Sequence, residues 1–285
     1  MAMVKINLAK SAGFCFGVKR ALGIALKTAA SGAKVYMLGD IVHNEDVVKR
    51  IRKVGIKKIR KLGRGQNKFL LIRAHGASFA TFQRARHLGY KIVDATCPMV
   101  REIHKIAQEM EKKGYRIIVI GDKRHDEVHG IAGHLKNKAI LIDNLKNIPL
   151  KSLGGIKKAC VVVQSTQNLD KVLRILEVLK QYIPELKFFN TICKPTRIKQ
   201  EEIKKISPDN DVVIIIGSKT SANTRRLYEI SKSLNKRSYW ITSKKELKPG
   251  WFKNAKNVGV TAGASTPELT TQEVIEHIRH LTFTA

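Results

Sequence analysis

Six short apolar runs, rich in β-branched residues, recur along the 285-residue chain, and a small polar loop follows each of them. The runs with their loops are V-Y-M-L-G-D-I-V-H-N, F-L-L-I-R-A-H-G, I-I-V-I-G-D-K-R-H-D-E, C-V-V-V-Q-S-T-Q-N, V-V-I-I-I-G-S-K-T-S-A-N and V-G-V-T-A-G-A-S-T-P-E. Continuous apolar character is typical of strands buried on both faces, as in a parallel sheet covered by helices. Helical patterns lie between the runs, for example at residues 169–182 and 223–233. This alternation predicts an α/β fold.

Three of the four cysteines, Cys15, Cys97 and Cys193, stand directly before predicted helices. Apolar residues at helical spacing follow each of them, as Val18 and Leu22 follow Cys15. The partial positive charge of a helix N-terminus favours a thiolate at that position. The distances in sequence, 82 and 96 residues, are about one small domain each and differ from the local spacing of a zinc finger.

The cysteines divide the chain so that two apolar runs fall in each part. We therefore expect three similar α/β lobes with mostly parallel sheets, at residues 1–96, 97–192 and 193–285. No Pro/Gly/Ser-rich linker separates these parts, so we expect the lobes to pack together. Ligand groups gather at the carboxyl ends of parallel strands. A pseudo-threefold arrangement of the lobes would bring three thiolates and six polar loops to one central cavity.

Three thiolates can hold three irons of a cubane cluster. Iron–sulfur clusters usually take four cysteines, so three would leave one iron open to substrate, as catalytic metal sites leave a position open. The fourth cysteine, Cys160, begins the run C-V-V-V, and we expect it to be a small core residue. On spacing alone, unrelated thiols are the simpler interpretation of three dispersed cysteines.

Neutral or weakly basic hydrogen-bonding side chains fill the polar loops: His43, His75, His125, Ser165, Thr166, Ser221, Asn223 and Ser265. Each of these alone is also a common capping or loop residue. Together they suit an anion such as diphosphate. Glu127 is the acid in these loops that we assign to catalysis, since a buried carboxyl group can have a raised pKa and donate a proton. A salt bridge with a lysine is the alternative interpretation.

The formal net charge is +31, from 54 Lys and Arg against 23 Asp and Glu. Nucleic-acid binding, attraction of an acidic substrate or partner, and simple solvation all remain open, and solvation is favoured because the charge is dispersed. No apolar run approaches 18 residues and the N-terminus lacks an apolar signal region, which predicts no membrane span and no export. Four cysteines without an export signal indicate a cytoplasmic protein.

Nine motifs follow one another along nearly the whole chain: A-G-F-C-F-G-V-K-R-A, I-V-H-N, R-A-H-G, D-A-T-C-P, H-D-E-V-H-G, Q-S-T-Q-N, N-T-I-C, G-S-K-T-S-A-N and G-V-T-A-G-A-S-T-P. In this order the motifs resemble those of the 4-hydroxy-3-methylbut-2-enyl diphosphate reductases, the last enzymes of the non-mevalonate isoprenoid pathway. None of the motifs would be sufficient alone, but nine in register are specific.

The resemblance implies three α/β lobes around a [4Fe–4S] cluster bound by Cys15, Cys97 and Cys193. The open iron would take the allylic hydroxyl, which two electrons and two protons remove as water to give isopentenyl and dimethylallyl diphosphates. The resemblance also implies that Glu127 delivers a proton, with Ser165 or Thr166 in the relay. It implies that the diphosphate is held by His43, His75, Ser221, Asn223 and Ser265, with His125 near both the diphosphate and the proton path.

Three positions depart from the family pattern. The family often has S-S-N where this chain has Ser221-Ala222-Asn223, so one hydroxyl contact to the diphosphate is either missing or supplied by Thr220 or Thr224. The relay position, often threonine, is Ser165. The segment K-P-T-R-I-K-Q after Cys193 differs from the commoner A-T-x-x-R-Q, which leaves the helix start there open.

A reductase of this kind needs an external one-electron donor, such as ferredoxin or flavodoxin. These donors are typically acidic, and a basic surface would steer them. A nucleic-acid-binding protein without a cluster is the main alternative function, but aromatic residues make up only 6% of the chain and no nucleic-acid-binding motif is found. A structural zinc protein is a third possibility.

Overall fold

Twelve strands in residues 4–283, the part of the chain that this computed structural model describes, form three entirely parallel four-stranded sheets. Sheet A has the order β1-β12-β10-β11, sheet B the order β3-β2-β4-β5, and sheet C the order β7-β6-β8-β9. The predicted α/β fold with parallel sheets is therefore confirmed.

The six predicted runs are the two central strands of each sheet. They form β2 (Val35–Leu38), β4 (Phe69–Ile72), β6 (Arg116–Ile120), β8 (Lys158–Val163), β10 (Val212–Ile216) and β12 (Asn257–Ala262). The edge strands are β1 (Lys5–Leu8), β3 (Lys57–Ile59), β5 (Lys91–Asp94), β7 (Ile140–Ile142), β9 (Glu185–Phe188) and β11 (Ser238–Ile241). The central strands have four to six residues and are mostly buried because helices cover both faces of the sheets, whereas the edge strands have three or four residues and most are partly exposed.

Nine α-helices lie in the described part of the chain. They are α1 (Phe16–Ala30), α2 (Glu45–Lys53), α3 (Phe79–His87), α4 (Pro98–Lys112), α5 (Asp126–Ala132), α6 (Leu169–Tyr182), α7 (Lys194–Ile206), α8 (Ala222–Leu234) and α9 (Glu268–Phe283). Helix α7 begins at Lys194, directly after Cys193, which gives the helix start that the sequence left open. In residues 4–283 no helix is both long enough and apolar enough to cross a membrane.

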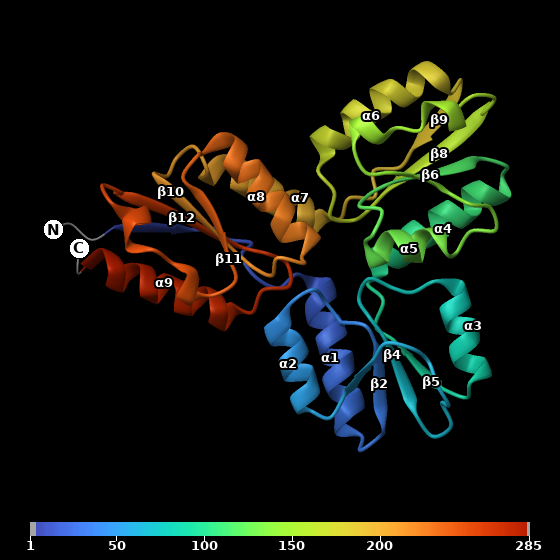
Figure 1. Cartoon of the computed structure of the whole chain (residues 1–285), viewed down its shortest axis with the longest axis horizontal. Coiled ribbons are helices and arrows are strands. Elements are labelled where there is room, and N and C mark those ends of the chain that lie inside the picture. Colours follow the sequence, from blue (N-terminus) through green and yellow to red (C-terminus); the bar gives the residue numbers. More distant parts are fainter. Residues whose placement is uncertain (1–3, 284–285) are drawn as a thin grey trace. The chain divides into compact units, whose positions relative to one another are not determined.

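By compactness the chain divides into two units. The first contains residues 4–19, 43–49 and 194–283, with sheet A; the second contains residues 20–42 and 50–193, with sheets B and C. In the first unit, alternate residues of β10 face opposite sides of the sheet. Val212 and Ile214 pack with α9, whereas Val213 and Ile215 pack with α7 and α8 (Figure 1).

Sheet C in the second unit has the same two-sided core. Ile118 and Val161 pack with α6 on one face, and Val119 and Val162 pack with α4 and α5 on the other. The helix predicted at residues 169–182 is α6, which buries Val172, Ile175, Leu176 and Leu179 against the sheet. Sheet C therefore lies between two helical layers.

The N-terminal strand departs from the predicted lobe at residues 1–96. Lys5–Leu8 pair in parallel with Asn257–Val260 of β12, so β1 belongs to the sheet of the C-terminal segment. The pairing covers the edge of β12, which would otherwise leave backbone donors and acceptors unpaired. The remaining boundaries of the three-lobe division, and a pseudo-threefold arrangement, stay predictions.

Candidate active site

Each of the three cysteines at a helix start is held in the same way. The backbone N–H of Cys15 donates to the Ala264 carbonyl at 3.1 Å, that of Cys97 to Ala74 at 2.9 Å, and that of Cys193 to Ser165 at 3.0 Å. All three acceptors lie in the polar loop that follows a central strand. The helix start and the strand end are thus joined locally, which places each cysteine beside a loop that carries predicted site residues.

The four cysteines differ in burial, and Cys160 was predicted to be the buried one. Cys15, Cys97 and Cys193 are partly exposed, whereas Cys160 is fully buried on β8. Cys160 packs with Ile103, Ala107 and Val162 between sheet C and its helices, and burial raises the pKa of its thiol to about 12. The assignment of Cys160 as a core residue is confirmed, and its neutral thiol is a poor ligand.

Glu127 is a buried carboxyl group at the start of α5, with 1% of its surface exposed. Its Oε1 accepts the backbone N–H of Ser165 at 2.6 Å, and its Oε2 accepts the Ser165 hydroxyl at 2.8 Å. Burial raises the pKa of Glu127 to about 7, although both hydrogen bonds from Ser165 oppose the shift. The carboxyl group is consequently able to hold or release a proton near neutral pH, which the salt-bridge interpretation would not give.

The two hydroxyls proposed for the proton relay have different contacts. Ser165 bonds Glu127 directly, and its carbonyl accepts the Cys193 N–H. Thr166 instead receives a hydrogen bond from Gln164 Nε2 at 3.0 Å, and Gln164 Oε1 accepts the backbone N–H of Asp122. Ser165 is therefore the residue that joins the carboxyl group to the cysteine loop.

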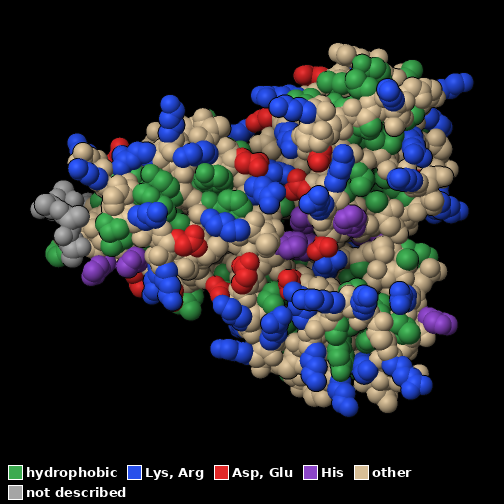
Figure 2. Space-filling view, viewed as in Figure 1, with side chains coloured by type: hydrophobic (Ala, Val, Ile, Leu, Met, Phe, Trp, Pro, Cys, Tyr) green, Lys and Arg blue, Asp and Glu red, His purple; other side chains and the backbone are tan. Residues whose placement is uncertain are grey.

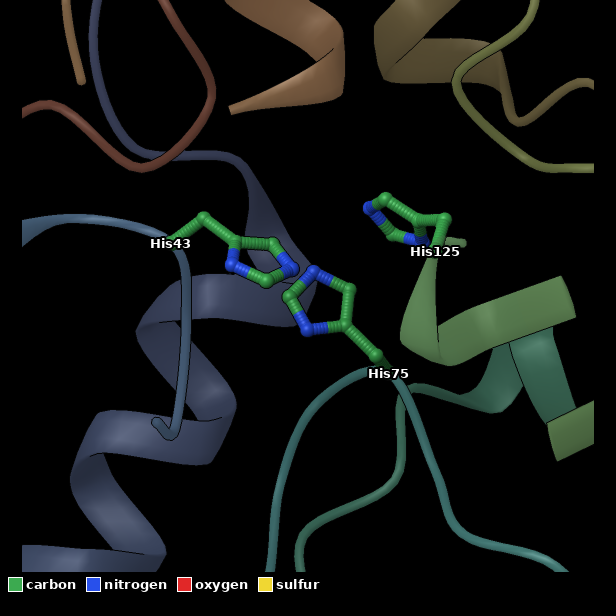
Figure 3. Close-up of side chains that lie close together, drawn as sticks. All are labelled: His43, His75 and His125. Atoms are coloured by element: carbon green, nitrogen blue, oxygen red, sulfur yellow. The ribbon is translucent and has the colours of Figure 1, made fainter. Parts of the chain in front are cut away.

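His75 and His125 lie together in the second unit. Their ring centroids are 5.2 Å apart and the rings meet edge to face at 90° (Figure 3). The Nδ1 of His125 accepts the backbone N–H of Glu127 at 3.2 Å, which caps α5 and places the proton of the neutral ring on Nε2. His75 follows directly after Ala74, the acceptor of Cys97. The two imidazoles thus lie at strand ends, with His125 at the start of the helix that carries Glu127 and His75 next to the residue that holds Cys97.

The remaining predicted residues belong to the first unit. Ser265, next to Ala264, donates its hydroxyl hydrogen bond to the backbone carbonyl of His43 at 3.0 Å. His43 itself precedes α2, whose first turn is capped by the side chain of Asn44 (Figure 3 shows the His43 loop). Ser265 therefore fixes the backbone from which the His43 imidazole projects.

Ser221 and Asn223 open α8. The Ser221 hydroxyl caps the helix by accepting the Thr224 N–H at 3.3 Å. The amide nitrogen and oxygen of Asn223, and the Thr224 hydroxyl, are buried without a hydrogen-bond partner in the part of the chain that the structure describes. Buried polar atoms are normally satisfied, so an unpaired amide at a helix start indicates a place for a ligand. Of the two threonines considered as a substitute for the missing serine, Thr220 bonds the Ser218 hydroxyl, whereas the Thr224 side chain is fully buried.

A family model described as LytB protein matches residues 6–279. The chain belongs to this family. Its sequence is 39% identical to the 4-hydroxy-3-methylbut-2-enyl diphosphate reductase of Aquifex aeolicus, over 98% of this chain and 97% of the relative. The enzyme of the same name from Geobacter metallireducens is 38% identical, over 98% of each chain.

Solved structures of family members match as well. A structure of (E)-4-hydroxy-3-methyl-but-2-enyl diphosphate reductase is 39% identical, with a TM-score of 0.72 over 98% of this chain and 100% of that one. The corresponding reductase from Plasmodium falciparum is 29% identical, with a TM-score of 0.88 over 96% of this chain and 88% of that one. LytB family membership thus extends to both sequence and fold.

Lys199, a buried residue that contacts the loop before Cys15, was not among the predicted site residues. It lies on the buried stripe of α7 with Thr196, Gln200 and Ile203, at the spacing of a helix face that packs inward. That spacing was a usable signal, but the many other basic residues obscured it. Figure 2 shows how widely Lys and Arg are spread over the face in view.

Proposed function

We propose that this protein catalyses the reductive dehydroxylation of (E)-4-hydroxy-3-methylbut-2-enyl diphosphate to isopentenyl and dimethylallyl diphosphates. Membership of the LytB family and near-full-length similarity to reductases of that name support the proposal. The geometric observation that carries it is the connection Glu127–Ser165–Cys193, in which a buried acid with a pKa of about 7 is bonded to the residue that holds a cysteine loop.

We propose a [4Fe–4S] cluster as the cofactor, held by Cys15, Cys97 and Cys193. The donor set fits, because three partly exposed cysteines stand at helix starts while the fourth thiol is buried and neutral. When bound, the cluster would supply electrons singly and offer one iron for the allylic hydroxyl. Because solvent-accessible thiols of this kind persist in reducing surroundings, we place the reaction in the cytoplasm.

The chain's own residues then handle protons and the diphosphate. Glu127 holds a proton near neutral pH and gives it to the departing hydroxyl, which leaves as water. The resulting carboxylate is stabilised by the two Ser165 donors. A second proton adds to the allylic carbon skeleton, and two electrons from outside balance the reaction. We assign Ser165, with Thr166 beside it, to the return of protons to Glu127.

For the diphosphate we propose His43, His75, Ser221, Asn223 and Ser265, with His125 between the anion and the acid. The unpaired Asn223 amide and the His75–His125 ring pair are the observations that support this set. The hydroxyl of Ser221 already caps α8, so its part in binding would use the free lone pair or follow a rotation.

The decisive test is anaerobic purification followed by iron and sulfide analysis, electron paramagnetic resonance and product analysis with the diphosphate substrate and a chemical reductant. We expect a cluster spectrum that changes on substrate addition and formation of both products. Replacing Cys15, Cys97 or Cys193 by serine should remove most of the iron, while Cys160→Ser should retain it. Colourless protein that binds RNA with a steep salt dependence would support the nucleic-acid alternative instead, and zinc without sulfide would support a structural zinc site.

We propose an acidic one-electron donor, such as a ferredoxin or flavodoxin, as the partner. The net charge of +31 supports this, since opposite charge accelerates encounter at low ionic strength. Raising the salt concentration should slow reduction by the protein donor but not by a small neutral reductant. Equal salt dependence of both rates would contradict steering.

A further inference from the structure

Lys199 is a buried lysine surrounded by backbone oxygens. Only 2% of its surface is exposed, and it is the largest fully buried side chain in the described part of the chain. Its ammonium group donates to the carbonyls of Ser11, Gly13 (3.0 Å) and Ala262 (3.2 Å). Three carbonyl acceptors satisfy all three N–H groups of an ammonium ion.

These three carbonyls belong to the two segments that hold Cys15. Ser11 and Gly13 lie in the loop that leads from β1 to Cys15, and Ala262 ends β12, two residues before the carbonyl that accepts the Cys15 N–H. One turn along α7, the carboxylate of Glu202 accepts the backbone N–H and the hydroxyl of Ser11. Two side chains of α7 thus fasten the loop before Cys15.

The charge of Lys199 has no direct counter-ion. Within residues 4–283 no carboxylate lies at ion-pair distance from its ammonium group, and a buried charge is costly in that situation. Burial lowers the pKa of Lys199 to about 8, while electrostatic interactions with Cys15 and Glu202 raise it. The side chain is therefore mainly cationic at neutral pH and lies close enough to Cys15 for their charges to interact.

We propose that Lys199 is a positioning residue for Cys15, which fixes the ligand loop and supplies a buried positive charge that raises the reduction potential of the cluster bound there. This inference rests on the proposed function. Reduction adds one electron to the cluster, so a fixed cation stabilises the reduced form more than the oxidised form. Net charge and polar surroundings are among the factors that set cluster potentials.

The test compares the holoenzyme with Lys199→Met, which removes the charge at similar length, and Lys199→Arg, which keeps it. Lys205→Met is the matched control, because Lys205 is exposed on the same helix. Midpoint potentials are measured by anaerobic redox titration followed by electron paramagnetic resonance. For Lys199→Met we expect a reduction equilibrium constant about tenfold lower, which is about 59 mV for a one-electron couple. Lys199→Arg and Lys205→Met should stay near wild type.

Hydrogen exchange of the cluster-free protein tests positioning even if Lys199→Met does not retain a cluster. We expect the amides of residues 11–15 to exchange about tenfold faster in Lys199→Met, with sheet C unchanged. A wild-type potential in Lys199→Met, or unchanged exchange of this loop, would overturn the inference while leaving the proposed function intact. If the wild-type protein itself holds no iron and sulfide, the proposed function fails, and the exchange result still decides the positioning role.

Discussion

Glu127 in the second unit and Lys199 in the first are both buried and ionisable, yet they end with opposite properties. Burial favours the neutral form of each and brings the pKa of Glu127 up to about 7 and that of Lys199 down to about 8. At neutral pH the carboxyl group is therefore near its midpoint, whereas the ammonium group remains mainly charged. Desolvation therefore makes Glu127 a proton donor near neutral pH but leaves Lys199 charged. The outcomes differ because the unperturbed pKa of a glutamate is acidic and that of a lysine is basic.

The largest expected effect is on turnover. Glu127→Gln keeps the shape and can still accept the Ser165 N–H, but it cannot release a proton. We expect turnover to fall by about 10²- to 10⁴-fold, the usual contribution of a general acid. Substrate binding should persist, and the change in the cluster spectrum on substrate addition measures it. Glu111→Gln is the matched control, since Glu111 is a carboxylate on α4 bonded to the backbone of Lys136 and Asn137. Near-normal turnover in Glu127→Gln would show that Glu127 is not the proton donor.

The next effect concerns stability against pH. Because the pKa of Glu127 is raised from 4.5 to about 7 on folding, the folded state binds the proton more tightly than the unfolded state between these values. The contribution of Glu127 to the free energy of unfolding is thus greatest below about pH 4.5 and is lost as the pH rises to about 7, a fall on the order of 3 kcal/mol. Urea unfolding of the wild type and of Glu127→Gln across this range measures it. The two profiles should differ in slope, and parallel profiles would show that the carboxyl group is not perturbed.

Ser165→Ala tests the side-chain hydrogen bond that opposes the rise in the pKa of Glu127. The Ser165 hydroxyl donates to the Glu127 carboxylate and should matter little once the carboxyl group is protonated. We expect a loss of about 1.5–3 kcal/mol in the free energy of unfolding at about pH 8 and a smaller loss at about pH 5. Ser152→Ala, at an exposed serine of the same unit, is the control. A pH-independent loss would mean that the hydroxyl supports packing only.

The smallest effect on stability is expected for Glu202, which lies one turn from Lys199 on α7. Glu202→Gln keeps an acceptor for Ser11 but removes the charge, and the group is partly exposed. We expect a cost below about 1 kcal/mol, reduced further by salt. Thermal unfolding at low and high salt would measure it. A loss of several kcal/mol in the free energy of unfolding would show that Lys199 depends on Glu202 as a counter-ion. Burial alone would then not account for the difference between Lys199 and Glu127.

The sequence predicted the central strands well because burial on both faces leaves a continuous apolar run, as in Val212–Ile216. The edge strands carried no such pattern. Lys57–Ile59, for instance, lies inside segment 49–64, which is rich in Lys and Arg. Two of the three strand residues are lysines, so no apolar run marks the strand. The pairing of β1 with β12 joins residues about as far apart as the chain allows, and no local pattern encodes it.

The candidate site shows the same division. Glu127 could be predicted because it is an acid at a strand end within a recognisable motif, and Cys160 because it begins an apolar run. The contacts of Ser165 with both Glu127 and the Cys193 loop depend on β6 and β8 being neighbours in the sheet, which single motifs do not show. Lys199 was not predicted because one buried lysine among 54 basic residues differs only in which face of a helix it occupies.

The pairing of β1 with β12 also sets an order on the assembly of the protein during synthesis. Cys97 and Cys193 are fastened to carbonyls that precede them in the chain, at Ala74 and Ser165, so the acceptor of each has already been synthesised when the cysteine is added. Cys15 is made first but is fastened to Ala264, near the other end. Of the three cysteines, Cys15 must wait for residue 264 before this hydrogen bond can form, so a ribosome that stops before residue 264 leaves a chain unable to anchor it.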